Sequence, residues 1–261
     1  MALGAAMMKP SANRKVRGQR TRAASPVMLT NRDHELLQLL GLCGYATTDQ
    51  VARDLFPSAD RASRRLRQLY DAGLVRVHLA GSRRPNLLSL SPSGRDVLVA
   101  AVGDVPGLQL PSAIPLHAID HHLGVVDVRL LLAALAQREV LQLHAWHGGR
   151  SELAAETGLT GAKLVPDGVV ELTLGDPGVV AVEVDNGTER LGGALAQKLA
   201  RYRGPLLART VTEVWLWASG SAARLEGIRR ACVEAGIARR TRLLTPADTA
   251  DRPARLPGRL A

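Results

Sequence analysis

The sequence contains only two cysteines and no long apolar run. Cys43 and Cys232 lie far apart and form no Cys-x-x-Cys pair, which argues against a disulfide scaffold or a cysteine zinc site and is typical of a reducing compartment. No stretch is apolar enough to span a bilayer, and no apolar signal segment precedes the first arginines. We therefore expect a cytoplasmic protein with no membrane partner.

Several motifs are absent as well. The chain has no P-loop, no Gly-x-Ser-x-Gly and no Gly-x-Gly-x-x-Gly stretch, so nothing in it supports nucleotide hydrolysis or serine hydrolase chemistry. His117 and His121 have the i, i+4 spacing of a zinc pair on a helix, but no third ligand is spaced to complete such a site. We interpret the histidines as surface or interface residues.

Basic residues are concentrated near the beginning of the chain. The formal net charge is +10, and residues 1–29 hold six basic residues and no acidic one. Residues 30–100 add ten arginines against seven acids, so nearly the whole excess lies in the first hundred residues. This distribution is the electrostatic footprint expected for a nucleic-acid partner, and the alternative is a solvated basic tail. We expect residues 1–29 to form a disordered tail.

Residues 30–102 have the pattern of a winged helix-turn-helix that binds double-stranded DNA. Capping signals and apolar spacing predict three helices, the last from Ser58 to Asp71, followed by two short strands and a further helix. The third helix separates an apolar face from a basic one, as a recognition helix requires. The candidate DNA-binding residues are Arg61, Arg64, Arg65 and Gln68 on this helix, with Arg83 and Arg84 at the tip of the wing.

Residues 103–116 are rich in proline and glycine and are predicted to be a linker to a second domain at 117–250, with a frayed tail at 251–261. In the second domain a long apolar helix precedes three strands, a helix and a nearly continuous apolar strand at 211–218. This order predicts a mixed sheet covered by helices. The fold class is therefore α/β, or α+β for the whole chain.

A group of charged residues falls on a predicted hairpin and the helix after it. The hairpin strands cover 165–174 and 179–185 around a turn at 175–178, which would place Asp167 roughly opposite Asp185. Lys198 and Tyr202 follow at i, i+4 on one face of the next helix. Packed carboxylates need a cation or a shared proton, so the group is either a metal site or a structural hairpin with Lys198 as its salt-bridge partner.

The order of elements, Pro166-Asp167 and Glu183-Val-Asp185 resemble the PD-(D/E)xK nuclease fold over residues 117–218. That resemblance implies Mg²⁺ bound by Asp167 and Glu183, and a catalytic group of Asp167, Glu183, Asp185 and Lys198. Asp185 stands where the family has its lysine, so Lys198 would supply the cation from the helix. For the family's acid on the first helix the candidates are Asp127, Glu139 and Glu152.

A narrower resemblance covers about residues 30–220. The segments His121-His122-Leu-Gly-Val-Val-Asp127, Pro166-Asp167-Gly-Val-Val and Glu183-Val-Asp185-Asn-Gly-Thr-Glu189 are similar to the replication-relaxation family of plasmids and mobile elements. The resemblance implies a double-stranded DNA-binding protein involved in replication or relaxation, with a nuclease-like domain that is either degenerate or an active Mg²⁺-dependent endonuclease or nickase. A winged-helix transcriptional repressor is the other alternative, and a homodimer is left open.

Overall fold

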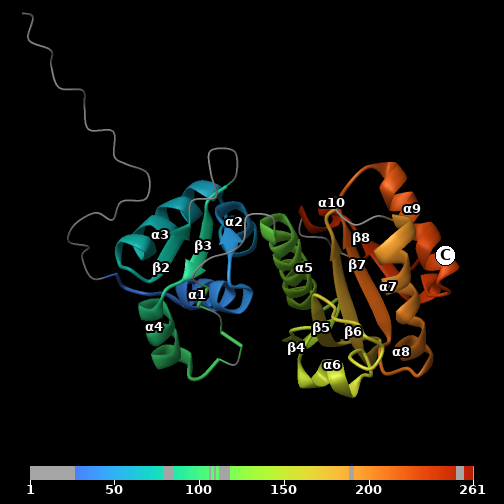
Figure 1. Ribbon diagram of the computed structural model, residues 1–261. Coiled ribbons are helices and arrows are strands. Elements are labelled where there is room, and N and C mark those ends of the chain that lie inside the picture. Colours follow the sequence, from blue (N-terminus) through green and yellow to red (C-terminus); the bar gives the residue numbers. More distant parts are fainter. Residues whose placement is uncertain are drawn as a thin grey trace, which may run out of the picture.

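The computed structural model describes residues 27–78, 85–105, 107–108, 110–111, 118–187, 191–250 and 256–260. Figure 1 shows two parts side by side, with the N-terminal elements on the left and the larger C-terminal sheet on the right. The predicted tails at 1–29 and 251–261 lie largely outside the described residues. Within the described part no helix combines the length and apolarity needed to cross a membrane.

The N-terminal part consists of helices around a small antiparallel sheet. Its helices are α1 (Asn31–Cys43), α2 (Thr48–Leu55), α3 (Ala59–Asp71) and α4 (Pro92–Val102), and its strands are β1 (Ala46–Thr47), β2 (Val75–His78) and β3 (Leu87–Leu90), in the order β1-β3-β2. Side-chain caps start the helices where the sequence predicts: the Thr47 hydroxyl accepts from the backbone of Gln50, and Ser58 and Ser91 do the same for α3 and α4. The helices and the strands β2 and β3 match the predicted order, and the short strand β1 is an addition that the sequence did not predict.

The C-terminal part is built on a five-stranded mixed sheet in the order β4-β5-β6-β7-β8. The strands are β4 (Gln142–His147), β5 (Gly168–Leu174), β6 (Asp176–Asp185), β7 (Glu213–Ala218) and β8 (Thr241–Leu244). Strands β4, β5 and β6 pair antiparallel, whereas β6, β7 and β8 pair parallel. The strand β7 is buried at every position, which is why its sequence is almost continuously apolar. The predicted α/β class is confirmed.

Helices cover both faces of this sheet. They are α5 (Ile119–Gln137), α6 (Glu152–Glu156), α7 (Ala196–Arg201), α8 (Arg203–Leu207), α9 (Ala222–Glu234) and α10 (Pro246–Ala250), with the short turns η2 (Leu191–Leu195) and η3 (Ala238–Arg240). The prediction of a single continuous helix after the hairpin, carrying Lys198 and Tyr202, is wrong in detail. Gly193 takes non-helical backbone angles and interrupts it, so a π-type turn and two short helices occupy this region.

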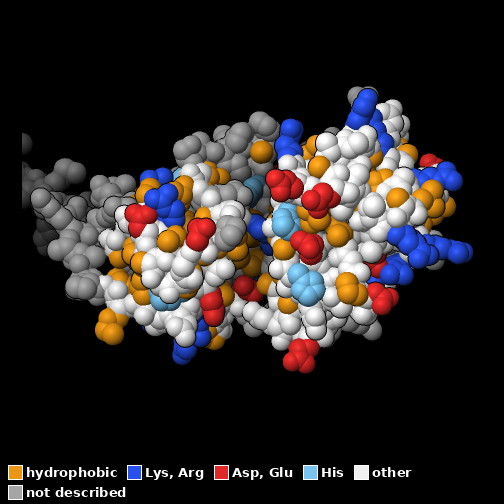
Figure 2. Space-filling model, turned by 90° about the horizontal axis from the view of Figure 1, so that it is seen from below, with side chains coloured by type: hydrophobic (Ala, Val, Ile, Leu, Met, Phe, Trp, Pro, Cys, Tyr) orange, Lys and Arg blue, Asp and Glu red, His pale blue; other side chains and the backbone are white. Residues whose placement is uncertain are grey.

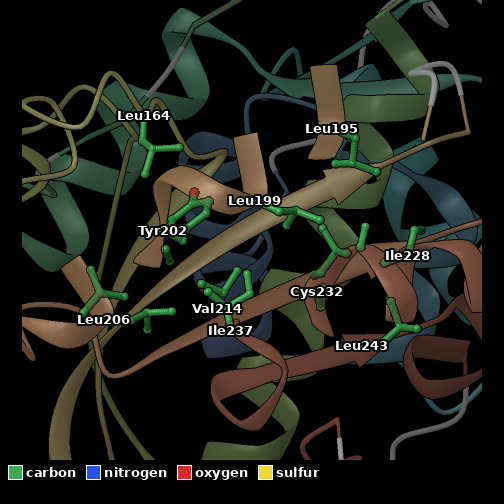
Figure 3. Packing of buried hydrophobic residues seen from close by; sticks show 14 of the residues in the cluster. Leu164, Leu195, Leu199, Tyr202, Leu206, Val214, Ile228, Cys232, Ile237 and Leu243 are labelled. Carbon is green, nitrogen blue, oxygen red and sulfur yellow. The ribbon is translucent and has the colours of Figure 1, made fainter. Parts of the chain in front are cut away.

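Three large apolar clusters form the core of the two parts, and a small fourth cluster of Tyr45, Leu87 and Ile119 lies between them. One fills the face of the sheet beneath α7 and α9, where Leu199, Ile228 and Val214 pack closely (Figure 3). Another lies between the opposite face and α5, and the third fills the N-terminal part. Helix α5 contributes to the last two: Leu131 packs on the sheet, whereas Val126 belongs to the N-terminal cluster. The two parts therefore share α5 as a common packing element.

The hairpin β5–β6 has a tighter turn than the sequence predicts. Leu174 pairs with Asp176, so Gly175 alone forms the turn, with a φ of 78° that favours glycine. The segment 176–178, predicted as part of the turn, instead extends β6. This shortens the connection and shifts the strand register by two residues relative to the predicted pairing.

Candidate active site and nucleic-acid interface

The shifted register brings Asp167 opposite Glu183. The Asp167 backbone N–H donates to the Val182 carbonyl at 2.9 Å, directly before the Gly168–Val182 pair that begins the ladder. The predicted pairing of Asp167 with Asp185 is therefore wrong, because the turn is shorter than predicted. Asp167, directly before β5, and Glu183, near the end of β6, therefore lie beside each other at the same end of the sheet.

Glu183 is the centre of this site and is only 3% exposed. The Lys198 ammonium donates to its Oε2 atom, and the Tyr202 hydroxyl donates to its Oε1 atom. Burial raises the pKa of Glu183 to about 7, with Asp167 adding to the rise and Lys198 opposing it. Burial likewise raises the pKa of Tyr202, so its hydroxyl keeps the proton that it donates. The i, i+4 spacing of Lys198 and Tyr202 thus directs both side chains to one carboxylate.

Asp167 is held between the sheet and helix α5. Its Oδ2 atom accepts a hydrogen bond from the Val184 backbone at 2.8 Å, and His121 Nε2 lies 2.8 Å from its Oδ1 atom. The hydrogen bond to Asp167 raises the pKa of His121. The helix approaches the sheet this closely at Gly124, where a Cβ atom would come within 2.7 Å of Val184. Sequence reasoning missed the role of His121, because no spacing rule relates the start of a helix to a strand 46 residues later.

Asp185 is paired with a different residue. Arg224 of α9 donates to both of its oxygens, at 2.8 Å from Nε and 2.7 Å from Nη2. Both side chains are largely buried, so this is a fixed bidentate pair. The structure brings Asp167, Glu183 and Lys198 together, and it engages Asp185 with an arginine that the sequence did not identify.

Asp127, one candidate for the acid on the first helix, lies on the other side of α5. Its Oδ1 atom accepts from Gln50 Nε2 at 3.1 Å and from Arg53, both on α2. Gln50 Nε2 also donates to the Leu123 carbonyl at 3.0 Å. Asp127 is therefore an interface residue between the two parts, and its assignment to the carboxylate site is wrong.

The donor set of the site suits a hard cation with few protein ligands. Among the described residues no group of three or more His, Cys, Asp and Glu side chains is placed to hold a metal, which leaves the two carboxylates of Asp167 and Glu183. Magnesium commonly takes one or two carboxylates and completes its shell with waters and phosphate oxygens. The residues present fit Mg²⁺ in that mode, and they do not fit a closed zinc site.

Helix α3 presents a basic face away from its core contacts. Ala62, Leu66 and Leu69 are buried, whereas Arg61, Arg64 and Gln68 are exposed. Within the described residues the guanidinium groups of Arg61 and Arg64 have no hydrogen-bond or ion-pair partner. They are therefore available to a ligand. The wing arginines Arg83 and Arg84 lie outside the described residues.

Arg65, predicted to contact DNA, instead connects α3 to α1. Its Nε atom donates to Asp33 Oδ1 at 2.7 Å, its Nη2 atom donates to Asp33 Oδ2 at 2.6 Å, and it also donates to the Met28 carbonyl and Gln68. Burial would raise the pKa of Asp33, but hydrogen bonds from Arg65 and Thr30 lower it below its ordinary value. Arg65 is thus the counter-charge of a carboxylate that is only 1% exposed.

The fold and the site define a mixed α/β protein that carries a buried carboxylate centre with a lysine and a tyrosine from a neighbouring helix. A family model described as replication-relaxation matches residues 37–212, which is more than half of the chain. The protein therefore belongs to the replication-relaxation family, and the predicted resemblance is confirmed. Membership suggests a role in the replication or relaxation of a plasmid or other mobile element. Comparison with curated proteins and with solved structures gave no match.

Proposed function

We propose that the protein binds double-stranded DNA through α3 and cleaves a phosphodiester bond at the Glu183 centre, in the replication or relaxation of a plasmid or mobile element. The observation that carries the proposal is the contact of Lys198 with Glu183 beside Asp167. A buried ionisable group is costly and is seldom retained without a partner or a task. Lys198 supplies from the helix the cation that Asp185 cannot supply from the strand.

The residues of the centre have separable tasks. Asp167 and Glu183 would hold Mg²⁺, which when bound polarises a phosphate oxygen as a Lewis acid. Lys198 is 29% exposed, so its ammonium can reach both Glu183 and a phosphate in solvent. Tyr202 fixes the orientation of Glu183 by donating to one oxygen, and His121 fixes Asp167 in the same way. Each carboxylate is thereby oriented before a substrate arrives, which is the preorganisation that catalysis requires.

DNA binding is supported by the arrangement of α3 in the N-terminal part. Arg61 and Arg64 lie on the exposed side of a helix whose opposite side is anchored in the core. A helix of this kind can enter the major groove, where arginine contacts phosphates and guanine edges. The net charge of +10 adds attraction for DNA that does not depend on sequence.

Cleavage is tested by incubating the protein with supercoiled plasmid in Mg²⁺, Mn²⁺ or chelator. We expect relaxed or linear plasmid with metal and none with chelator. Asp167→Asn, Glu183→Gln and Lys198→Met should each lower the rate by at least about 100-fold, since each removes a charge at the reacting phosphate. The matched control is Glu226→Gln, which changes an exposed acid on α9 and should leave the rate unchanged. Equal loss in the control would contradict the assignment.

DNA binding is tested separately by a gel shift in chelator. The double variant Arg61→Ala/Arg64→Ala should weaken duplex binding and reduce the slope of log K against log salt by about 2. The control is Arg229→Ala, an exposed arginine on α9. The three variants of the carboxylate centre should bind DNA as the unchanged protein does. If the double variant binds normally, α3 is not the recognition helix.

A second candidate is a replication-control protein that binds DNA without cutting it. It is favoured by one observation: both oxygens of Glu183 and both oxygens of Asp167 already accept hydrogen bonds. In that case the centre only fixes α5 and α7 against the sheet, and no plasmid cleavage should occur with any metal while the gel shift and its dependence on Arg61 and Arg64 persist.

A further inference from the structure

A second candidate site lies at the opposite end of the sheet. A hollow of about 460 Å³ opens beside the first residues of β6 and β7, next to Gly178 and Glu213. Glu183 stands near the other end of β6, five residues beyond Gly178, which is about 17 Å along a strand. This hollow, hereafter the arginine hollow, therefore shares no residue with the carboxylate centre.

Four arginines and two carboxylates line the arginine hollow. The arginines are Arg209, Arg239, Arg240 and Arg259, and the carboxylates are Asp176 and Glu213. Figure 2 shows Lys and Arg side chains, with Asp and Glu side chains among them, on the right-hand part of the molecule. With four guanidinium groups against two carboxylates, the hollow is positively charged, unlike the acidic centre at the other end of the sheet.

The carboxylate of Glu213 is already neutralised. Arg242 donates to it at 2.6 Å from Nε, Trp215 donates at 2.8 Å, and Arg259 also forms an ion pair with it. Burial would raise the pKa of Glu213, but these hydrogen bonds lower it. One carboxylate therefore faces two guanidinium groups, and the Arg259 side chain remains 55% exposed.

Arg209 and Arg239 carry the remaining positive charge. Both are exposed, and within the part of the chain that the structure describes neither guanidinium group has a hydrogen-bond or ion-pair partner. Arg209 adopts a φ of 59°, the left-handed conformation that commonly ends a helix, directly after the C-cap of α8. Arg240 is fixed nearby by donating to the Leu206 carbonyl at 3.2 Å.

Two apolar side chains, Leu174 and Pro177, give the arginine hollow an accessible apolar surface beside its charged groups. Leu172 and Val180 lie beneath them and belong to the core between the sheet and α5. Pockets for small ligands combine apolar surface with convergent polar groups and have volumes of about 300–1,000 Å³. The backbone of a DNA duplex presents its phosphates on a convex surface and would leave this apolar lining uncovered.

We propose that the arginine hollow binds a nucleoside phosphate. The phosphate groups would lie against Arg209 and Arg239, since guanidinium groups match phosphate oxygens with paired hydrogen bonds. The nucleoside would cover Leu174 and Pro177. The site does not depend on the carboxylate centre or on α3.

The test is isothermal titration calorimetry of the full chain with ADP, ATP and inorganic pyrophosphate, in chelator so that magnesium does not contribute. We expect saturable binding of ADP or ATP with a Kd below about 1 mM. The double variant Arg209→Asn/Arg239→Gln should weaken this binding at least 10-fold, with Asn chosen because it tolerates the left-handed conformation. The control Arg229→Gln should change it less than 2-fold.

Unfolding of the double variant is checked by its melting temperature. If the double variant melts at a lower temperature than the unchanged protein, the single variant Arg239→Gln is used instead, because it removes only an exposed charge. A 3-fold loss of nucleotide affinity is then expected. The proposal is overturned if neither nucleotide binds, if the control loses as much affinity as the variant, or if pyrophosphate binds as tightly as ADP. It is also overturned if a short oligonucleotide binds through the same arginines while the nucleotides do not.

Discussion

The substitution Glu183→Gln should remove part of the pH dependence of the unfolding free energy. Folding raises the pKa of Glu183 from an ordinary value of 4.5 to about 7, because the carboxylate loses water and lies near Asp167. At a pH between the unfolded and the folded pKa values, such an acid takes up a proton when the protein folds. Its contribution to the unfolding free energy is therefore fully present below pH 4.5 and is lost as the pH rises through 7.

The size of the effect follows from the shift. A difference of one pKa unit corresponds to about 1.4 kcal/mol, so this shift corresponds to roughly 3 kcal/mol of unfolding free energy. No discount for solvent is needed, since the Glu183 side chain is only 4% exposed. The glutamine is neutral at every pH, and it can still accept a hydrogen bond from Tyr202.

The assay is urea unfolding between pH 5 and pH 8.5 in chelator. At pH 5 the two proteins should differ little, because Glu183 is protonated in the folded state. At pH 8.5 the variant should be more stable by up to about 3 kcal/mol. The difference in unfolding free energy between the two proteins at each pH cancels the titration of the groups that they share. The matched control Glu226→Gln should give a difference that does not change with pH, since Glu226 is exposed. A Glu183→Gln difference that is constant across the range would refute the reasoning.

Two further substitutions test the packing that positions the sites. Arg65→Ala should lower the unfolding free energy by about 2–3 kcal/mol, because the buried carboxylate of Asp33 loses its counter-charge. The control Arg64→Ala should change the unfolding free energy by about 0.5 kcal/mol or less, and thermal melts of the two variants test the difference. Gly124→Ala should cost about 1–3 kcal/mol, since the added methyl group meets Val184, and a melt that matches the unchanged protein would contradict the close approach of α5 to the sheet.

Local sequence signals predicted most of the helices and strands. The caps at Thr47, Ser58 and Ser91 lie at the observed helix starts, because a capping hydroxyl satisfies backbone donors within its own turn. The sequence also indicated that Lys198 and Tyr202 share a helix face. The sequence did not predict the strand register, because a difference of a few residues in the turn changes every pair along the hairpin. The one-residue turn at Gly175 places Asp167 opposite Glu183 and not opposite Asp185.

The sequence by itself determined the family, the class of fold, the basic face of α3 and the candidate carboxylates. These depend on residue types and on spacings within one helix or strand. Only the tertiary structure decided the partners: Arg224 for Asp185, His121 for Asp167, Asp33 for Arg65 and α2 for Asp127. The arginine hollow likewise draws its residues from four separate segments. Such contacts depend on how close two elements approach in space, and no periodicity along the chain records that distance.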